Sequence, residues 1–394
     1  MSGPNYLEKL LDGVEVRWKS VSEIFHLKNG YTPSKSTNEY WMDGTIPWFR
    51  MEDIRENGQI LGDSLQKVSV SAVKGGKLFP AQSIIIATSA TIGEHALITI
   101  PHLANQRFTC LALKSCYVDN FDIKFIYYYC FLLAEWCKKN TTMSSFASVD
   151  MDGFRRFMFP IPCPDNPKKS LEIQAEIVRI LDTFTELTAE LTAELTARKK
   201  QYNYYRDQLL SFEEREVEWK TLGEVYKFQY GMGNTIPTLG GEYPVYGSNG
   251  IVGSHNEFNS EDSPVIGHIG AYAGIVNWGA GKHFVTYNGV ICKLINKLVH
   301  PKYAYYQLLK QDFNSMAKSA SHPFISYDAL NKVSVPIPPP AEQARIVAIL
   351  DKFDALTNSL TEGLPREIEL RQKQYEYYRD LLLSFPKPDA EAAA

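Results

Sequence analysis

The sequence lacks the marks of several protein classes. Its longest apolar runs, such as SIIIA at 83–87, are far shorter than the roughly 20 residues that cross a bilayer. The start, MSGPNYLEKLLDG, has neither the basic nor the apolar stretch of a signal peptide. The six cysteines include no CxxC pair, and the eight histidines show no metal-ligand spacing. We therefore predict a cytoplasmic protein with reduced cysteines, no membrane segment and no metal site.

Known catalytic motifs are also missing. The chain has no GxxxxGK[ST] phosphate loop, no [DN]PP[YF] methyltransferase tetrapeptide, no GxSxG and no HExxH. Pro164-Asp165 is followed by Glu172-Ile173-Gln174, which lacks the lysine of a PD-(D/E)xK nuclease. These absences favour a binding protein that is not an enzyme and holds no cofactor itself. A stand-alone enzyme with an unrecognised site is one alternative.

One long segment occurs twice. QYNYYRDQLLSF at 201–212 and QYEYYRDLLLSF at 374–385 agree in ten of twelve positions, and the likeness extends back to Gln174 and Gln343. A proline run precedes each copy, at 159–167 and 335–340. The N-terminal stretch 6–23 resembles 204–224, so the chain begins with the end of a repeat unit. This pattern predicts a pseudo-two-fold molecule with a circularly permuted repeat.

Both copies have the spacing of long helices. Apolar residues from Ile177 to Phe212 recur at seven- and four-residue intervals, and no glycine or proline interrupts 168–212. The second copy has four extra residues in its middle, with Gly363 and Pro365 among the residues there. We expect a central helix at 172–216 and a C-terminal helix at 342–385, kinked near 363–365, packed antiparallel as a coiled coil.

Two variable domains, 13–171 and 217–341, alternate with these helices in the sequence. Each has a turn-rich start, then β-branched runs typical of strands, then an aromatic-rich helix at 121–140 or 301–320. Ser148 and Ser326 follow, and we expect each to cap a short helix rather than to act in catalysis. The fold class is thus α+β, with two mixed α/β domains, a short N-terminal end at 1–12 and a flexible tail at 386–394.

Charge alone does not indicate a nucleic-acid binder, because the net charge is −4. The acidic excess lies in the repeated helices: 172–216 carry six basic and ten acidic residues, whereas 13–171 and 217–341 are close to neutral. Polar and basic residues in the loops of the two domains are of the kinds that read base edges. The first domain offers Lys28, Thr32, Ser34, Lys35, Arg50, Arg55, Lys74, Lys77, Ser89, Thr91, Asn105, Gln106 and Arg107. The second offers Tyr246, Ser248, Asn249, His255, His268, Tyr272, Lys282, His283, Tyr287 and Asn288.

The sequence combines two variable domains with two near-identical helical segments. A proline run precedes each helical segment, and the N-terminus begins with the end of a repeat unit. This combination resembles the specificity subunit of type I restriction–modification systems over essentially the whole chain. TAELTAEL at 188–195 is similar to the subgroup with such repeats in its central helix. The stretches at 30–48 and 243–253 resemble two types of target-recognition domain in that family.

The resemblance implies that each domain reads one half of a bipartite, asymmetric site in double-stranded DNA. It also implies that the helices set the spacing and dock two modification subunits, with Tyr204, Arg206, Asp207, Tyr377, Arg379 and Asp380 as candidate contacts. Those partners would bind S-adenosylmethionine and methylate adenine, and motor-nuclease restriction subunits would use ATP and Mg²⁺. The main alternative is a coiled-coil scaffold with two protein-binding domains and no DNA role.

Overall fold

The computed structural model describes residues 6–142, 147–233, 236–237, 240–317, 323–359 and 362–387. The chain divides into two compact units: unit 1 comprises 1–189 and 370–394, and unit 2 comprises 190–369. Most of the tail predicted at 386–394, and the first five residues of the predicted N-terminal end, lie outside the described residues.

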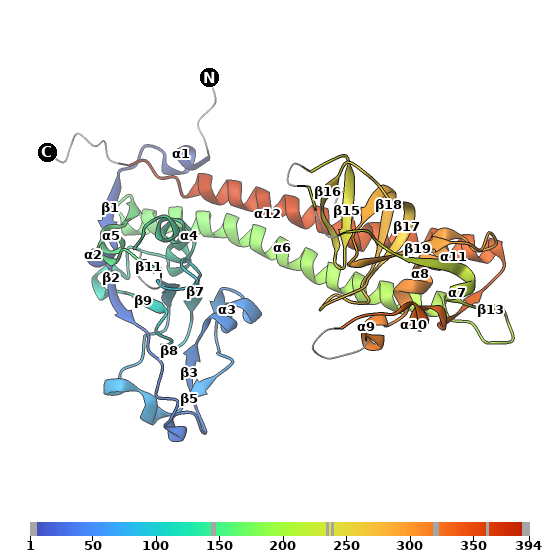
Figure 1. Ribbon diagram of the computed structural model, residues 1–394. Helices are drawn as coiled ribbons and strands as arrows, with labels where there is room; N and C mark the ends of the chain where they lie inside the picture. Colours follow the sequence, from blue (N-terminus) through green and yellow to red (C-terminus); the bar gives the residue numbers. More distant parts are fainter. Residues whose placement is uncertain are drawn as a thin grey trace. The chain divides into compact units, whose positions relative to one another are not determined.

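Unit 1 is built on a five-stranded sheet with the order β2-β9-β6-β7-β4, in which only β4 and β7 are parallel neighbours (Figure 1). Its strands are β2 (Phe25–Asn29), β4 (Ile60–Leu61), β6 (Ser83–Ala87), β7 (His95–Ile98) and β9 (Phe108–Leu113). A second sheet joins β5 (Lys67–Val68), β3 (Ile46–Phe49) and β8 (Leu103–Ala104). Two further antiparallel pairs are β1 (Val16–Ser20) with β12 (Met158–Pro162), and β10 (Thr141–Thr142) with β11 (Ser148–Val149). The short helices are α1 (Tyr6–Leu11), α2 (Val21–Ile24), α3 (Met51–Asn57) and α5 (Met151–Arg156), and the longer α4 (Ile123–Lys139) packs on β6 and β7.

Unit 2 repeats this frame with a six-stranded sheet of order β14-β19-β17-β18-β15-β16. The strands are β14 (Tyr226–Tyr230), β15 (Tyr243–Gly247), β16 (Gly250–His255), β17 (Ser260–Gly267), β18 (Val276–Val285) and β19 (Gly289–Leu294). A separate pair joins β13 (Glu218–Thr221) to β20 (Ser334–Ile337). The helices are α7 (Leu222–Val225), α8 (Pro301–Lys310), α9 (Phe313–Met316), α10 (Tyr327–Asn331) and α11 (Pro340–Asn358). The order β14-β19-β17-β18 matches β2-β9-β6-β7, so the common plan expected from the sequence is confirmed.

Local sequence signals explain how each unit begins. Ser20 and Thr221 cap α2 and α7, and Glu23 and Glu224 complete the two capping boxes. Later in each unit the caps differ. Ser326 caps α10 through a hydrogen bond from the Ala329 amide, as predicted. The prediction for Ser148 is wrong: this residue lies in β11, and Asp150 caps α5 because its carboxylate accepts two amide hydrogens there.

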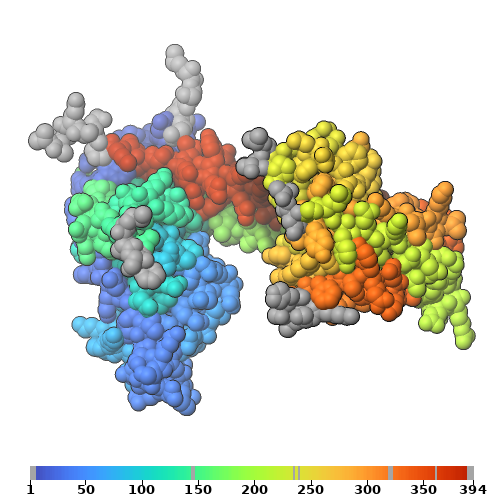
Figure 2. All heavy atoms as spheres, viewed as in Figure 1, coloured from blue at the N-terminus to red at the C-terminus, as the bar shows by residue number. Residues whose placement is uncertain are grey.

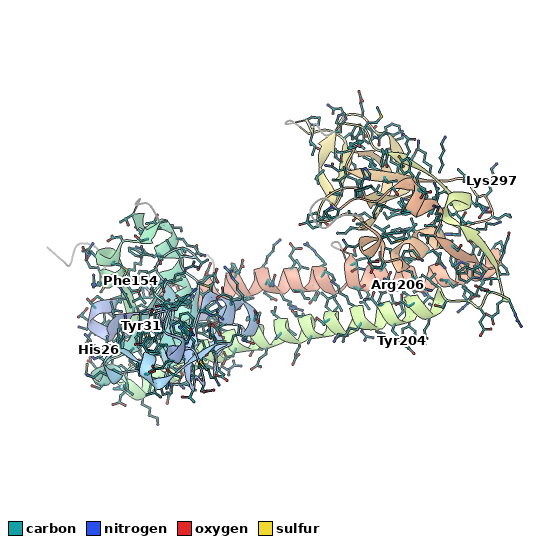
Figure 3. All side chains as sticks on the ribbon, turned by 60° about the horizontal axis from the view of Figure 1, so that its bottom comes forward. His26, Tyr31, Phe154, Tyr204, Arg206 and Lys297 are labelled. Atoms are coloured by element: carbon teal, nitrogen blue, oxygen red, sulfur yellow. The ribbon has the colours of Figure 1, made fainter. Side chains whose placement is uncertain are left out.

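The repeated segments form one long helix and two shorter ones. The first copy is α6 (Pro167–Leu209), 43 residues long, and the boundary between the units falls within it, after Ala189. In the second copy, α11 ends at Asn358 and α12 (Gly363–Leu382) begins at a glycine with φ +75°. The second copy is therefore divided between two helices, where the sequence predicted one helix kinked near 363–365. Within unit 1, Phe184 of α6 stacks on Tyr378 of α12, and the two helices lie side by side (Figures 1 and 3).

Each unit ties its repeated helix to its own domain helix with the same polar contacts. The side chain of Gln174, fully buried, accepts from the Asp122 amide at 2.9 Å and donates to the Asn120 carbonyl at 2.7 Å. Gln343, also fully buried, accepts from the His300 amide at 2.7 Å and donates to the Leu298 carbonyl at 3.3 Å, and also to the Pro338 carbonyl at 2.8 Å. Both glutamines thereby hold the start of the domain helix, α4 or α8. These contacts were not predicted.

A tyrosine–carboxylate pair follows two turns further along. Asp182 accepts from the Tyr128 hydroxyl at 2.7 Å, and Asp351 accepts from the Tyr306 hydroxyl at 2.5 Å. Tyr128 and Tyr306 are buried, so these aromatic residues belong to the packing between the helices. Polar contacts inside an apolar contact surface fix the register of two helices, because a slip would leave buried groups unpaired.

The two ends of the chain complete one core. Leu7 and Leu11 of α1 are buried in unit 1 together with Leu382, Leu383 and Phe385. The Phe385 ring packs edge-on against Phe125 of α4, with 5.8 Å between ring centroids. In this unit the C-terminal segment occupies the position that the residues after α6, including Leu210, occupy in unit 2. This arrangement is what a circularly permuted repeat requires.

Candidate nucleic-acid interface

Equivalent loops meet at one end of the sheet in each unit. After β2, the Gly30 amide donates to the Phe108 carbonyl at 2.8 Å, and after β14, the Gly231 amide donates to the Gly289 carbonyl at 2.9 Å. A Cβ on Gly30 would lie 2.1 Å from the Asn105 carbonyl oxygen, and one on Gly231 would lie 2.1 Å from that of Thr286. Only glycine permits so close an approach. The segment after each glycine is thus held against the loop before β9 or β19.

In unit 1 these loops line an open, polar hollow of about 520 Å³. Its lining residues come from β3 and from segments next to β3, β5 and β8, whose small sheet belongs to the blue part of unit 1 in Figure 2. Six of the thirteen candidates in this domain line it: Thr32, Lys35, Arg50, Asn105, Gln106 and Arg107. The positions of these six residues in the sequence do not indicate that they lie close together in the fold. Their proximity depends on the parallel pairing of β3 with β8, which brings 103–107 beside 48–50.

The hollow combines positive charge with planar polar groups. Its lining includes three basic side chains and one acidic one, Glu52. The Thr32 hydroxyl donates to the Gln106 side-chain oxygen, and the Asn105 side chain accepts from the Arg107 amide at 3.0 Å. These contacts order both loops. A positive hollow lined by amides, a hydroxyl and guanidinium groups is suited to a ligand that is anionic and rich in acceptors, as the grooves of DNA are.

The other candidates of unit 1 lie outside the hollow lining. Lys28 and Lys74 are exposed, with their ammonium groups over the rings of Phe79 and Tyr31 at 5.2 and 4.7 Å. Arg55 pairs with Glu94 at 3.4 Å, and this exposed pair contributes little to stability. The rest have mixed settings: Ser34 and Lys77 are exposed, Ser89 forms a backbone bridge, and the Thr91 hydroxyl is buried.

In unit 2, three of the candidates are buried. Tyr246, His268 and His283 are at most 7% exposed, and each makes an internal hydrogen bond, to Trp278, Ile325 and Gly281 respectively. Burial lowers the pKa of both histidines, which favours neutral rings at pH 7. The sequence alone could not show this, because it does not tell which of these side chains the fold turns into the core. Of the remaining candidates, Asn249, Tyr272, Lys282 and Tyr287 are exposed, and Ser248, His255 and Asn288 are partly exposed.

An aromatic cluster lies beside the Gly231 loop. Two of its members, His268 and Tyr287, were candidates from the sequence, and Tyr230 and Tyr327 were not. The Tyr230 ring stacks on Tyr327 at 4.1 Å and approaches His268 at 4.3 Å and Tyr287 at 5.8 Å, measured between ring centroids. Tyr287 occupies the loop equivalent to that of Gln106 and is 45% exposed. The equivalent loops thus carry polar groups in unit 1 and aromatic ones in unit 2.

The partner-contact candidates on the helices divide into exposed and covered side chains. Tyr204 and Tyr377 are 59% and 65% exposed. The side chains of Arg206 and Arg379 are only 17% and 15% exposed, and each bonds to the next residue, Asp207 or Asp380. Figure 3 shows Tyr204 and Arg206 projecting from different sides of α6. The structure therefore covers most of each candidate arginine side chain, while the two tyrosines remain exposed.

Among the described residues, no group of three or more histidine, cysteine, aspartate or glutamate side chains could hold a metal ion. Nor does any helix in the described ranges have the length and apolar character needed to cross a membrane.

Comparison with known proteins agrees with this architecture. A family described as "Type I restriction modification DNA specificity domain" matches residues 14–198 and 214–370. The specificity subunit of type I restriction enzyme EcoprrI from Escherichia coli is 57% identical over 375 residues, covering 92% of this chain and 93% of the relative. That of EcoR124I/EcoR124II, also from Escherichia coli, is 38% identical over 441 aligned positions and covers 99% of both chains.

Two solved structures share the fold. The S subunit of a type I restriction–modification system from M. genitalium matches with a TM-score of 0.55 at 18% identity, covering 95% of this chain and 98% of that one. A chain from a type I R-M system, solved to study complex assembly and conformational transition, matches with a TM-score of 0.62 at 15% identity, covering 93% and 97%. Taken with the repeated family match and the close relatives, these findings show that the chain belongs to the family of type I restriction–modification specificity subunits.

Proposed function

We propose that this chain is the DNA-recognition subunit of a type I restriction–modification complex and that each unit reads one half of a bipartite site. One observation carries the proposal. Each unit holds equivalent loops together by the close approach of a glycine, Gly30 or Gly231, and these loops carry different side chains in the two units. A shared frame with unlike reading loops suits two different half-sites. The scaffold alternative explains neither the positive, amide-lined hollow nor the family membership.

The chain supplies recognition, and its partners supply chemistry and further phosphate contacts. Since the net charge is −4, we expect DNA to be gripped jointly with modification subunits. We propose two such subunits per chain, each using S-adenosylmethionine, with restriction subunits that use ATP and Mg²⁺, acting in the cytoplasm.

Exchange of one domain tests independent reading. Replacing 217–341 with the corresponding segment of the EcoprrI relative should give the half-site that the relative's segment reads and leave the other half-site unchanged, because β13 to β20 form a self-contained frame. Methylation mapping of cells that express the chimera with its modification subunit gives the readout. The reciprocal exchange of 13–171 is the matched control. If both half-sites changed together in either chimera, independent reading would be refuted.

Docking of two identical partners would use the surface that the repeated helices share. Tyr204 and Tyr377 are exposed at equivalent positions, one in each unit. Because exposed aromatic residues often dominate protein interfaces, Tyr204→Ala or Tyr377→Ala should each weaken one partner site about tenfold or more. The double variant should lose the two-to-one complex, as measured by native mass spectrometry without DNA.

Tyr272→Ala is the control for this experiment, because Tyr272 is a similarly exposed tyrosine, 49%, in a loop of unit 2. It should leave assembly unchanged. Arg206→Glu should perturb the helix as well as assembly, since the arginine is mostly covered and lies 5.8 Å from the Tyr202 ring. Undiminished assembly of the tyrosine double variant would rule out this face.

A further inference from the structure

Arg50 lies in the polar hollow of unit 1 with its side chain largely enclosed and its hydrogen-bonding capacity unused. The side chain is 29% exposed, and Nε is buried without a hydrogen-bond partner in the described part of the chain. The nearest carboxylate, Glu52, lies 4.0 Å from Nε, beyond hydrogen-bonding distance. A guanidinium has five N–H donors, and covered polar groups in proteins are nearly always paired. Because Nε is enclosed, a ligand in the hollow would meet the terminal Nη groups of this guanidinium.

The surrounding structure holds Arg50 in place without satisfying it. Its backbone amide donates to Asp53 Oδ2 at 2.6 Å, and Asp53 Oδ1 accepts from the Leu65 amide at 2.6 Å. The fully buried Asp53 is therefore committed to backbone groups. The guanidinium carbon lies 5.6 Å from the centroid of the Trp48 ring, and a cation over an aromatic face is stabilised there. The result is a positively charged group beside Trp48 and at ion-pair distance from Glu52, whose Nη groups have no hydrogen-bond partner among the described residues.

The planar guanidinium group of an arginine can donate two parallel hydrogen bonds to two adjacent acceptors in one plane. Guanine presents such a pair, O6 and N7, on its major-groove edge, whereas adenine places a donor beside its N7 acceptor. A phosphate group also offers two acceptors, but Lys35 and Arg107, which line the same hollow and are exposed, are better placed for a backbone that passes along its opening. Gln66 and Asn105 in the same lining could pair with neighbouring base edges.

We propose that Arg50 is a specificity-determining residue that reads one guanine in the half-site recognised by unit 1. This inference rests on the proposed function, since it requires that unit 1 reads DNA. It assigns one base to one side chain, which neither the fold nor family membership does.

The test uses the whole chain in complex with its modification subunit. Methylation mapping first defines the wild-type site, and duplexes carrying each of the four base pairs at every position of the unit 1 half-site then serve as substrates. Arg50→Ala should abolish the preference for guanine at one position, where the wild type discriminates about 5- to 150-fold. Arg50→Lys should keep guanine preferred, because lysine can donate to the same two acceptors. The half-site read by unit 2 should not change.

Arg155→Ala is the matched control, an arginine of the same unit that pairs with Asp152 on α5, away from the hollow. It should retain full discrimination. A uniform loss of affinity over all sequences in Arg50→Ala, with a weaker salt dependence, would identify a phosphate contact and overturn the proposal. Unchanged discrimination in Arg50→Ala would overturn it too, while continued modification by the wild type would leave the proposed function standing. If the wild-type complex modified no bipartite site, the proposed function itself would fail.

Discussion

A chain with one extra TAEL unit after Leu195 is expected to modify DNA whose half-sites lie one base pair further apart, and to stop modifying the original site. The insertion adds four residues to the uninterrupted α6, about 6 Å at 1.5 Å per residue, and rotates one end by about 40°. Since B-DNA rises about 3.4 Å per base pair, the added length corresponds to one or two base pairs. We favour one, because some of the length can be taken up where α11 ends and α12 begins.

Methylation mapping of this variant decides the outcome. The bases within each half-site should stay the same, since the insertion lies outside both sheets. Thr192→Lys, a change at an exposed position of the same repeat that keeps its length, serves as the control and should preserve the wild-type gap. An unchanged gap in the insertion variant would show that α6 does not set the spacing. Altered bases would show that recognition depends on the helix.

Removing either buried glutamine is expected to destabilise its own unit strongly and leave the other intact. Gln174→Ala leaves the Asp122 amide and the Asn120 carbonyl unpaired and creates a cavity, which should cost about 3 kcal/mol. Gln343→Ala should do the same at the start of α8. Hydrogen exchange measured by mass spectrometry can follow α4 and α8 separately.

The two variants are each other's controls. Gln174→Ala should raise exchange in α4 and not in α8, and Gln343→Ala should give the reverse. Gln201→Ala removes a glutamine from α6 whose side chain accepts from Arg198 and is not fully buried, so it should change neither helix. Equal loss of protection in both helices from one variant would show that the units unfold together, against the division into two.

Much of the fold follows from local pattern, and the exceptions have physical causes. The strands Ser83–Ala87, His95–Ile98 and Phe108–Leu113 form because short, continuous and mostly apolar runs suit a sheet buried on both faces. The Ser148 prediction failed because Asp150, two residues later, is an equally good cap and lies at the actual helix start. Periodicity identified the repeated helices, but not that Gln174 and Gln343 would be buried polar contacts. That depends on what packs against them.

The candidate site was predictable only as a set of residue types. Six residues of unit 1 converge because β3 and β8 pair in parallel, a long-range contact with no signature in the sequence. Tyr246 and His283 looked like surface readers, yet the alternation of the strands turns them inward. Arg50 stood out only when the structure showed that its Nε is buried without a hydrogen-bond partner and that Asp53 accepts from backbone amides instead.

The division of the chain sets an unusual order for folding during synthesis. Unit 1 needs 370–387, which bring Leu382, Leu383 and Phe385 into its core, while unit 2 is complete once 369 has been made. Most proteins finish their N-terminal domain first. Here the ribosome makes 180 residues, 190–369, between the two parts of unit 1, and at 5–20 residues per second this takes roughly 10–40 s. During that interval the apolar face of α4 around Phe125 lacks its cover, so the nascent first domain is the species most in need of a chaperone.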